Sequence, residues 1–472
     1  MAASHLLVCV ILCTSYYLAH GGDEHGFVTV PTSSFEPDEV CSDSRVNTEP
    51  SRAAVSVPLL HRHGPCASSH NSDDTPSLIE RLGRSRARAN YIRDRASMGT
   101  VTRQDDDTNV TIPAQLGGSV DSLEYVVTVG LGTPSVSQTL LMDTGSDLSW
   151  VQCAPCNSTA CYPQKDPLFD PSKSSTYALI PCNTDLCRNL TANDYGNGCT
   201  TGGGGGGSGA QCKFSIEYGD GSHTRGVYSE ETLTLAPGVT VKDFRFGCAR
   251  DQDGSNDKFD GLVGLGGAPE SLVSQTSSVY GGSFSYCLPA RNGEAGFLTL
   301  GGARSSANDT SGFVFAPMRV EAGTFYMVNL TGISIAGKLD IPQAVFGKSI
   351  GTVMDSGTVL TYLPKTAYSA LRTAFRSAMS AYPLLPPNED LDTCYNLTGF
   401  SNVTLPTVAL TFDGGVTMDL DVPNGILLDG CLAFQESGPD EFPAILGNVN
   451  QRKFEVLYDV DHGKVGFRAG AC

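Results

Sequence analysis

Apolar and polar residues alternate over short stretches through most of the chain after about residue 120, which is the pattern of half-buried β-strands. Two of these stretches, residues 212–218 and 227–235, flank a glycine-rich turn and predict a β-hairpin. Helical periodicity is scarce, and the best helix is predicted over residues 366–380, after Pro364 and before Pro383. The chain contains 53 Gly and 26 Pro, which is consistent with many turns between short strands. The pattern predicts a mostly β fold.

The first 21 residues have a different pattern. Residues 6–13 form an apolar run, and Ala19-His20-Gly21 then supplies small residues around a cleavage point. We interpret residues 1–21 as a secretory signal peptide. The alternative is a membrane anchor, but the run is shorter than the roughly 20 residues that span a bilayer, so no anchor is expected.

Residues 22–112 contain Arg but no Lys, and the first Lys is Lys165. Residues 77–92 are compatible with a basic helix. This helix is either a solvated linker or part of a prosegment that covers an acidic site at neutral pH. Asp105-Asp106-Asp107 would then mark an exposed junction near the processing point. Seven Arg lie between residues 80 and 103: Arg81, Arg84, Arg86, Arg88, Arg93, Arg95 and Arg103.

The charge balance argues against one class of partner. The 472 residues include 31 Lys and Arg against 50 Asp and Glu, a net charge of −19. After residue 112 there are 21 Lys and Arg against 36 Asp and Glu. Binding to nucleic acid needs a basic face, so no nucleic-acid partner is expected.

Cysteines and sequons favour an oxidising, extracytoplasmic compartment. Twelve of the 16 Cys follow residue 112, an even number that suits six disulfides, and seven of them lie within residues 153–212 around the glycine run 202–207. Cys153 and Cys156 have the spacing of a redox motif but not its strand–helix context, and no second pair suits zinc, so no metal site is expected. The glycosylation sequons are Asn109, Asn157, Asn189, Asn308, Asn329, Asn396 and Asn402.

The most informative feature is an internal repeat. Residues 143–151 read DTGSDLSWV and residues 355–363 read DSGTVLTYL, and eight of the nine positions match in type. An apolar strand end precedes each copy, and two aliphatic residues with a Gly follow it, 119 residues after Asp143 and 90 residues after Asp355. The Cys-rich insertion accounts for the longer first half. A single Asp-Thr-Gly is usually only a turn, but two in matching contexts indicate a duplicated functional loop.

The chemistry of the motif explains its form. Gly lets the chain turn tightly beside the carboxylate, and the next hydroxyl, Ser146 or Thr358, can hydrogen-bond it. Two such loops face to face would place two carboxylates around one water molecule. Like charges at that distance share a proton over an acidic range, so one group can act as a base and the other as an acid. This chemistry needs no cofactor.

With these motifs the chain resembles a pepsin-family aspartic protease of the plant nepenthesin-like group over residues 120–472, and residues 59–66 resemble prosegments of plant members. The resemblance implies a mostly β, bilobal fold with a cleft between two related lobes. The expected order is a prosegment over 22–112, an N-terminal lobe over 113–310 with its insertion at 153–212 and a flap at 212–235, and a C-terminal lobe over 311–472.

The resemblance also implies roles for individual residues. Asp143 and Asp355 would be the catalytic dyad. The loops that support it would be Thr144-Gly145-Ser146 and Ser356-Gly357-Thr358, cross-linked through the hydroxyls of Thr144 and Ser356. The flap would present Tyr218, Gly219 and Asp220, with the Tyr218 hydroxyl toward Trp150, and Asp220 would favour basic substrate groups. The implied disulfides are Cys153–Cys156, Cys161–Cys248, Cys182–Cys212, Cys187–Cys199, Cys287–Cys472 and Cys394–Cys431.

The implied function is an aspartic endopeptidase made as a secreted zymogen and active at acidic pH. Its partners would be protein or peptide substrates and its own prosegment, and it would act as a monomer in the apoplast or vacuole. Three alternatives remain. The chain could be a catalytically silent binding or inhibitor protein on the same scaffold, or a nucleic-acid binder despite its charge. It could also be a serine or cysteine hydrolase, although no Gly-x-Ser-x-Gly elbow accompanies His223 or His462.

Overall fold

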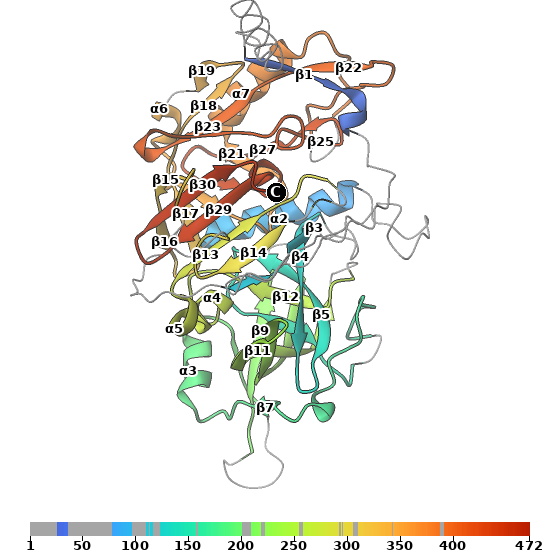
Figure 1. The fold of residues 1–472 in the computed structure, drawn as a ribbon, viewed down its shortest axis with the longest axis vertical. Helices are drawn as coiled ribbons and strands as arrows, with labels where there is room; N and C mark the ends of the chain where they lie inside the picture. Colours follow the sequence, from blue (N-terminus) through green and yellow to red (C-terminus); the bar gives the residue numbers. More distant parts are fainter. Residues whose placement is uncertain are drawn as a thin grey trace, which may run out of the picture.

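The chain folds into two β-rich lobes joined by a central sheet (Figure 1). This computed structural model describes residues 26–35, 78–96, 110–112, 114–116, 123–156, 159–200, 209–218, 222–253, 258–291, 294, 296–304, 310–341, 343–387 and 391–472. The expected signal peptide, the segment 59–66 and the acidic junction at 105–107 lie outside these residues.

The N-terminal lobe is a ten-stranded sheet. Its order is β3-β4-β5-β12-β6-β11-β10-β9-β8, with β7 paired to β10. The strands are β3 (Ala114–Leu116), β4 (Tyr125–Leu131), β5 (Val136–Asp143), β6 (Trp150–Gln152), β7 (Ala178–Leu179), β8 (Gly196–Cys199), β9 (Cys212–Glu217), β10 (His223–Ala236), β11 (Val239–Asp253) and β12 (Gly261–Gly264).

The C-terminal lobe contains a six-stranded sheet, a four-stranded sheet and a two-stranded sheet. The first is β16 (Arg319–Glu321), β17 (Phe325–Val328), β20 (Thr352–Met354), β28 (Ala444–Leu446), β21 (Thr361–Pro364) and β27 (Phe434–Gly438). The second is β19 (Lys338–Ile341), β18 (Leu330–Ile335), β23 (Val408–Phe412) and β24 (Val416–Asp419), and the third is β25 (Leu427–Leu428) with β26 (Cys431–Leu432).

The central sheet takes strands from both halves of the chain. Its order is β15 (Val314–Pro317), β30 (Lys464–Ala469), β29 (Phe454–Asp459), β13 (Ser283–Cys287), β14 (Phe297–Leu300) and β2 (Val110–Ile112). Phe284 stacks on Tyr458 across the sheet with ring centroids 4.5 Å apart, and both rings are fully buried. This shared core fixes the lobes against each other.

Within the described residues the helices are few, as predicted: α2 (Leu78–Arg95), α3 (Asp185–Ala192), α4 (Leu272–Gln275), α5 (Ser277–Tyr280), α6 (Gln343–Phe346) and α7 (Lys365–Ala378). The predicted helix over residues 366–380 is α7. Ala367, Leu371 and Phe375 recur every four residues and are fully buried, so one face of α7 packs on the core.

Two segments of the region before residue 110 pack against the lobes. Helix α2 crosses the middle of the molecule (Figure 1), where Leu82, Ala89 and Ile92 enter an apolar cluster with residues of the C-terminal lobe. The helix extends over the stretch for which the sequence predicts a basic helix. Strand β1 (Phe27–Pro31) pairs in antiparallel fashion with β22 (Asn402–Pro406), and the short 3-10 helix η1 (Thr32–Phe35) follows.

The structure contains six disulfides. Cys287–Cys472 and Cys394–Cys431 agree with the expected pairing. The expected Cys153–Cys156, Cys161–Cys248, Cys182–Cys212 and Cys187–Cys199 are wrong. The observed pairs are Cys153–Cys248, Cys156–Cys161, Cys182–Cys199 and Cys187–Cys212.

Strand pairing explains the Cys153–Cys248 disulfide, and the closeness of four cysteines explains why the other expected pairs were wrong. Cys153 directly follows β6, which runs beside β11, and its N–H donates to Ala249 O at 2.8 Å, so Cys248 is its neighbour. In the other group, Cys199 and Cys212 face each other across β8 and β9, and the Sγ atoms of Cys182 and Cys187 are 3.9 Å apart. Because these four cysteines lie close together, their sequence spacing does not determine which of them pair.

The expected flap hairpin is formed by β9 and β10, with Glu217 opposite His223. Gly219 and Asp220 at its tip lie outside the described residues. Four of the sequon Asn residues are exposed: Asn189, Asn329, Asn396 and Asn402. Asn109, Asn157 and Asn308 fall outside the described part of the chain. Among the described residues, no helix is both long and apolar enough to cross a membrane.

Candidate active site

The duplicated motif occupies equivalent places in the two lobes. Asp143 is the last residue of β5, and Asp355 directly follows β20. Strand β12 lies parallel to β5 and antiparallel to β6, while β28 lies parallel to β20 and antiparallel to β21. The sequence repeat is therefore also a repeat of topology. It brings both carboxylates, fully buried, to the boundary between the lobes.

Each carboxylate is held by its own loop. Gly145 N donates to Asp143 Oδ1 at 2.9 Å, and Gly357 N donates to Asp355 Oδ1 at 3.1 Å. The hydroxyls of Ser146 and Thr358 donate to the other oxygen of the corresponding carboxylate.

There is no room for a side chain at either glycine. A Cβ on Gly145 would lie 2.8 Å from Asp355 Oδ1, and one on Gly357 would lie 2.7 Å from Asp143 Oδ1. Each carboxylate thus packs against the glycine that follows the other.

Thr144 and Ser356 tie the two loops together. Ser356 N donates to Thr144 Oγ1 at 2.9 Å, and Thr144 N donates to Ser356 Oγ at 3.2 Å. Each hydroxyl donates in turn to a carbonyl of the opposite loop, Thr144 to Met354 O and Ser356 to Met142 O. The bonds are buried and reciprocal, so they fix the spacing of the two Asp residues.

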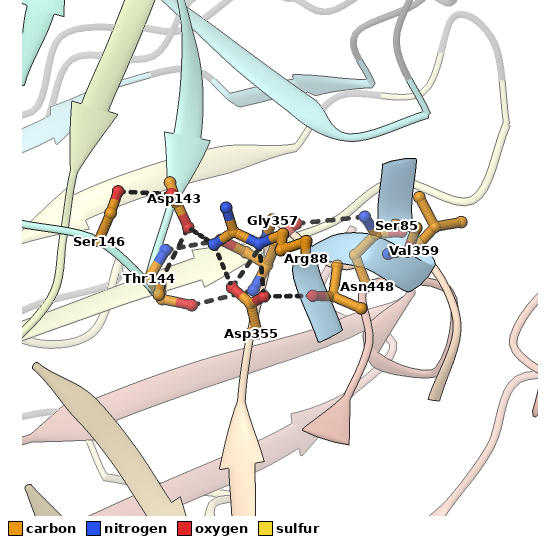
Figure 2. A network of polar contacts seen from close by, with 12 residues as sticks. Ser85, Arg88, Asp143, Thr144, Ser146, Asp355, Gly357, Val359 and Asn448 are labelled. Atoms are coloured by element: carbon orange, nitrogen blue, oxygen red, sulfur yellow. Dashed lines mark hydrogen bonds and ion pairs between the residues drawn. The ribbon is translucent and has the colours of Figure 1, made fainter. Parts of the chain in front are cut away.

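Arg88 of α2 lies between the two carboxylates (Figure 2). Its Nε donates to Asp355 Oδ2 at 2.9 Å, and its Nη2 donates both to Asp355 Oδ1 at 3.1 Å and to Asp143 Oδ1. One nitrogen therefore contacts both acids. Ser85, one turn earlier in α2, accepts a 2.9 Å hydrogen bond from Val359 N, so the helix is also held by the backbone of the second loop.

The electrostatics of this group follow from burial and charge. Burial raises the pKa of Asp143, the Arg88 charge opposes that rise, and Asp355 reinforces it. Burial favours neutral Arg88, but Asp143 and Asp355 outweigh this effect and raise the pKa of the guanidinium. The cluster is a buried cation held by two acids, and Arg88 remains charged in it.

Tyr218 lies at the end of β9 beside the site. Trp150 Nε1 donates to its hydroxyl at 2.6 Å, which is the contact that the resemblance implies. These two rings line a pocket of about 100 Å³ together with Glu124, Phe259 and Arg84 of α2. Burial raises the pKa of Glu124, while the charges of Arg84 and Arg88 oppose the rise. The pocket is mainly apolar, with Glu124 as its one acidic group, and both Arg84 and Arg88 of α2 line it.

Asp147 is a site residue to which the sequence analysis gave no role. It is fully buried, its Oδ1 accepts from Ala268 N, and its Oδ2 accepts from Tyr195 Oη and Thr324 Oγ1, each at 2.8 Å. The sequence repeat contained an indication of this role, because the second copy has the apolar Val359 at the position equivalent to Asp147. A charged residue in only one of two equivalent loops indicates a specific set of partners.

Within the described part of the chain, no group of three or more His, Cys, Asp or Glu side chains is placed to hold a metal ion. His223 lies in the flap hairpin as the first residue of β10, and His462 lies in the exposed turn before β30, with Nδ1 2.7 Å from Asp459 Oδ1. Neither histidine is placed by the structure beside Asp143 or Asp355.

Comparisons with known proteins agree with this geometry. Residues 125–302 match the family described as xylanase inhibitor N-terminal, and residues 325–469 match xylanase inhibitor C-terminal. The chain is 36% identical to the aspartyl protease AED1 of Arabidopsis thaliana over 99% of this chain and 98% of that protein. It is 34% identical to aspartic proteinase nepenthesin-2 of Nepenthes gracilis over 74% of this chain and 78% of that protein.

A solved structure supports the fold alone. Basic 7S globulin from soybean superposes with a TM-score of 0.60 at 21% identity, covering 77% of this chain and 95% of that one.

Proposed function

This chain belongs to the plant aspartyl proteases of the pepsin-like fold, and we propose that it is an aspartic endopeptidase that hydrolyses peptide bonds in proteins. One observation carries the proposal: Asp143 and Asp355, from equivalent loops of the two lobes, contact the same nitrogen of Arg88. Two buried carboxylates this close, each held by a Gly N–H and a hydroxyl, are suited to share a proton.

The proposed reaction is general acid–base catalysis by the dyad. With one proton shared between Asp143 and Asp355, the ionised carboxyl takes a proton from water as the water oxygen bonds to the peptide carbon. The protonated carboxyl gives its proton to the carbonyl oxygen. The tetrahedral intermediate then collapses: a hydroxyl of the intermediate returns its proton to the ionised carboxyl, the C–N bond breaks, and the nitrogen receives the proton that the other carboxyl took from water. No covalent enzyme intermediate is formed.

The region before Val110 would act as a prosegment. Helix α2 fills the space above the dyad, and Arg88 occupies the position that the reaction requires for water and substrate. Acidification protonates the carboxylates and weakens their attraction for Arg88, so the helix would be released at low pH. Among the basic residues of the predicted prosegment helix, this assigns the inhibitory role to Arg88.

The proposed location, oligomeric state and substrates rest on the sequence and on the disulfides. The signal-like residues 1–21, the cystines and the exposed sequons support a secreted glycoprotein of the apoplast or vacuole. Both Asp residues come from one chain, so a monomer would hold a complete site. Protein or peptide chains are the proposed substrates.

The substrate pocket supports a preference for basic residues. Glu124 lines it with Arg84, and Asp220 belongs to the flap sequence beside it. We expect Glu124→Gln and Asp220→Thr each to lower the ratio of kcat/KM for Lys-containing over Leu-containing peptides. An unchanged ratio in both variants would contradict the preference.

The catalytic proposal is tested with processed protein between about pH 2 and 6. Wild type should cleave a peptide library and be blocked by pepstatin, while Asp143→Asn and Asp355→Asn should each be inactive. If correctly folded wild type, freed of residues before Val110, cleaves nothing in this range, the alternative of a catalytically silent binding protein is favoured.

A further inference from the structure

The outer edge of β22 in the C-terminal lobe carries a second peptide contact of this chain, away from α2, whose Arg88 contacts the dyad (Figure 1). Strand β1 pairs with β22 over five residues in continuous register, from Phe27 opposite Pro406 to Pro31 opposite Asn402. Among the described strands, β1 is the only strand partner of β22. On the other edge of β22, Thr404 N donates to Tyr382 Oη at 2.6 Å.

Both ends of the pairing are extended by further bonds. At one end Thr407 donates to Gly26 O from its N–H at 2.8 Å and from its hydroxyl at 2.9 Å. At the other end Thr32 N donates to Ser401 O at 3.0 Å, and Thr32 Oγ1 donates to Phe400 O at 2.8 Å. The main-chain bonds therefore extend past the strand itself, as in recognition by strand addition.

Side chains give the contact its specificity. Val30 is 8% exposed and belongs to the main hydrophobic core, whereas Val28, on the same strand, is 38% exposed. Phe35 packs against the same core. Gly26 has φ +69°, and a Cβ there would lie 2.1 Å from Ala336 C, so a side chain at this position would collide with the backbone.

From these contacts we propose that the β22 edge is a strand-binding site for residues 26–35 of the chain, independent of α2. The two elements are separated by residues 36–77, and β1 shares no contact with the dyad. A cut between β1 and α2 would therefore leave residues 26–35 bound to the C-terminal lobe as a noncovalent peptide. The consequence for maturation rests on the proposed function, but the binding itself does not.

The test uses the Asp143→Asn chain from Gly22 onward, without the predicted signal peptide and its Cys9 and Cys13, so catalysis plays no part. A recognition sequence for a site-specific protease is inserted between Pro37 and Asp38, which leaves neither Cys41 nor Cys66 in the fragment. After cleavage, gel filtration without denaturant should recover the fragment with the main chain. Elution of the fragment as a free peptide would overturn the proposal.

Matched variants test the register. Val30→Asp places a charge in the core and should lower the retained fraction about tenfold or more, whereas Val28→Asp should retain the fragment. Equal release from both variants would overturn the assigned register.

A competition experiment avoids variants that fold poorly. Excess synthetic peptide of residues 26–36 should displace the fragment from the cut protein, while the same peptide with Gly26→Val should not. Displacement by both peptides, or by neither, counts against the site.

Discussion

Thr324 Oγ1 donates a 2.8 Å hydrogen bond to Asp147 Oδ2, and this bond links the C-terminal half of the chain to the loop that carries Asp143. Tyr195 and Ala268 complete the set of donors, so one carboxylate joins three separate segments. All three partners donate to it, and an ionised carboxylate accepts all three bonds, whereas the amide nitrogen of Asn would offer no acceptor to the donor on its side.

We expect Asp147→Asn to lower the free energy of unfolding by roughly 1 to 3 kcal/mol, because the amide leaves a buried donor unpaired. Urea unfolding at neutral pH measures the change. Asp185→Asn is the control, since its ion pair with Arg188 is exposed and its loss should change little. Equal effects of the two substitutions would show that Asp147 has no special structural role.

The second prediction concerns Arg88 and the inhibition of the uncleaved chain by its prosegment. The Arg88 charge favours ionised carboxylates in the closed form, so protons are taken up when α2 leaves and low pH favours release. Arg88→Gln should raise the pH of half-maximal activation by about one unit or more. Peptide hydrolysis after incubation across a pH series measures this. Arg86→Gln, at an exposed position of the same helix, should activate as wild type does. If Arg88→Gln activates at the same pH as wild type, Arg88 does not hold the prosegment in place.

Tyr218 and Trp150 allow a spectroscopic test, because Trp150 is the only Trp in the chain. Tyr218→Phe removes the acceptor of the 2.6 Å bond from the indole. We expect a blue shift of the Trp emission and a loss of about tenfold in kcat/KM, since the flap is then less well positioned. Unchanged emission would mean that the bond is not formed in solution.

Asp260 predicts a loss of stability as pH rises from about 4 to about 8. It is fully buried, and burial together with a hydrogen bond to the Asp166 side chain raises its pKa to about 8. A raised carboxyl pKa gives stability that is fully present below about pH 4 and is lost as pH rises through about 8.

Asp166→Asn removes the neighbouring charge, so it should lower the pKa of Asp260 and reduce this loss. Urea unfolding at pH values on either side of the range compares the variant with wild type. The same loss of stability in both would contradict the pairing.

The sequence predicted the part of the site that local chemistry determines. Asp143 and Asp355 were identified because a tight turn with a glycine and a hydroxyl is written in adjacent residues, and its duplication implied two facing loops. Helix α7 was predicted because its apolar period and flanking prolines are local as well.

Features that depend on tertiary register were not predictable in this way. Seven Arg indicated a basic helix, but only the docked position of α2 selects Arg88 from among them. In the same manner, Cys182 and Cys187 have sulfur atoms 3.9 Å apart, so spacing alone could not assign their partners.

Strand β2 fixes where the body of the molecule begins. Val110, Thr111 and Ile112 are buried and pair with β14, so a chain that started after them would expose an edge of the central sheet. A cut just before Val110 spares that sheet. Of the strand pairs described, it would leave β1 with β22 as the only one joining the two products. Once α2 has been released, this five-residue pairing would determine whether the N-terminal product stays bound to the C-terminal lobe.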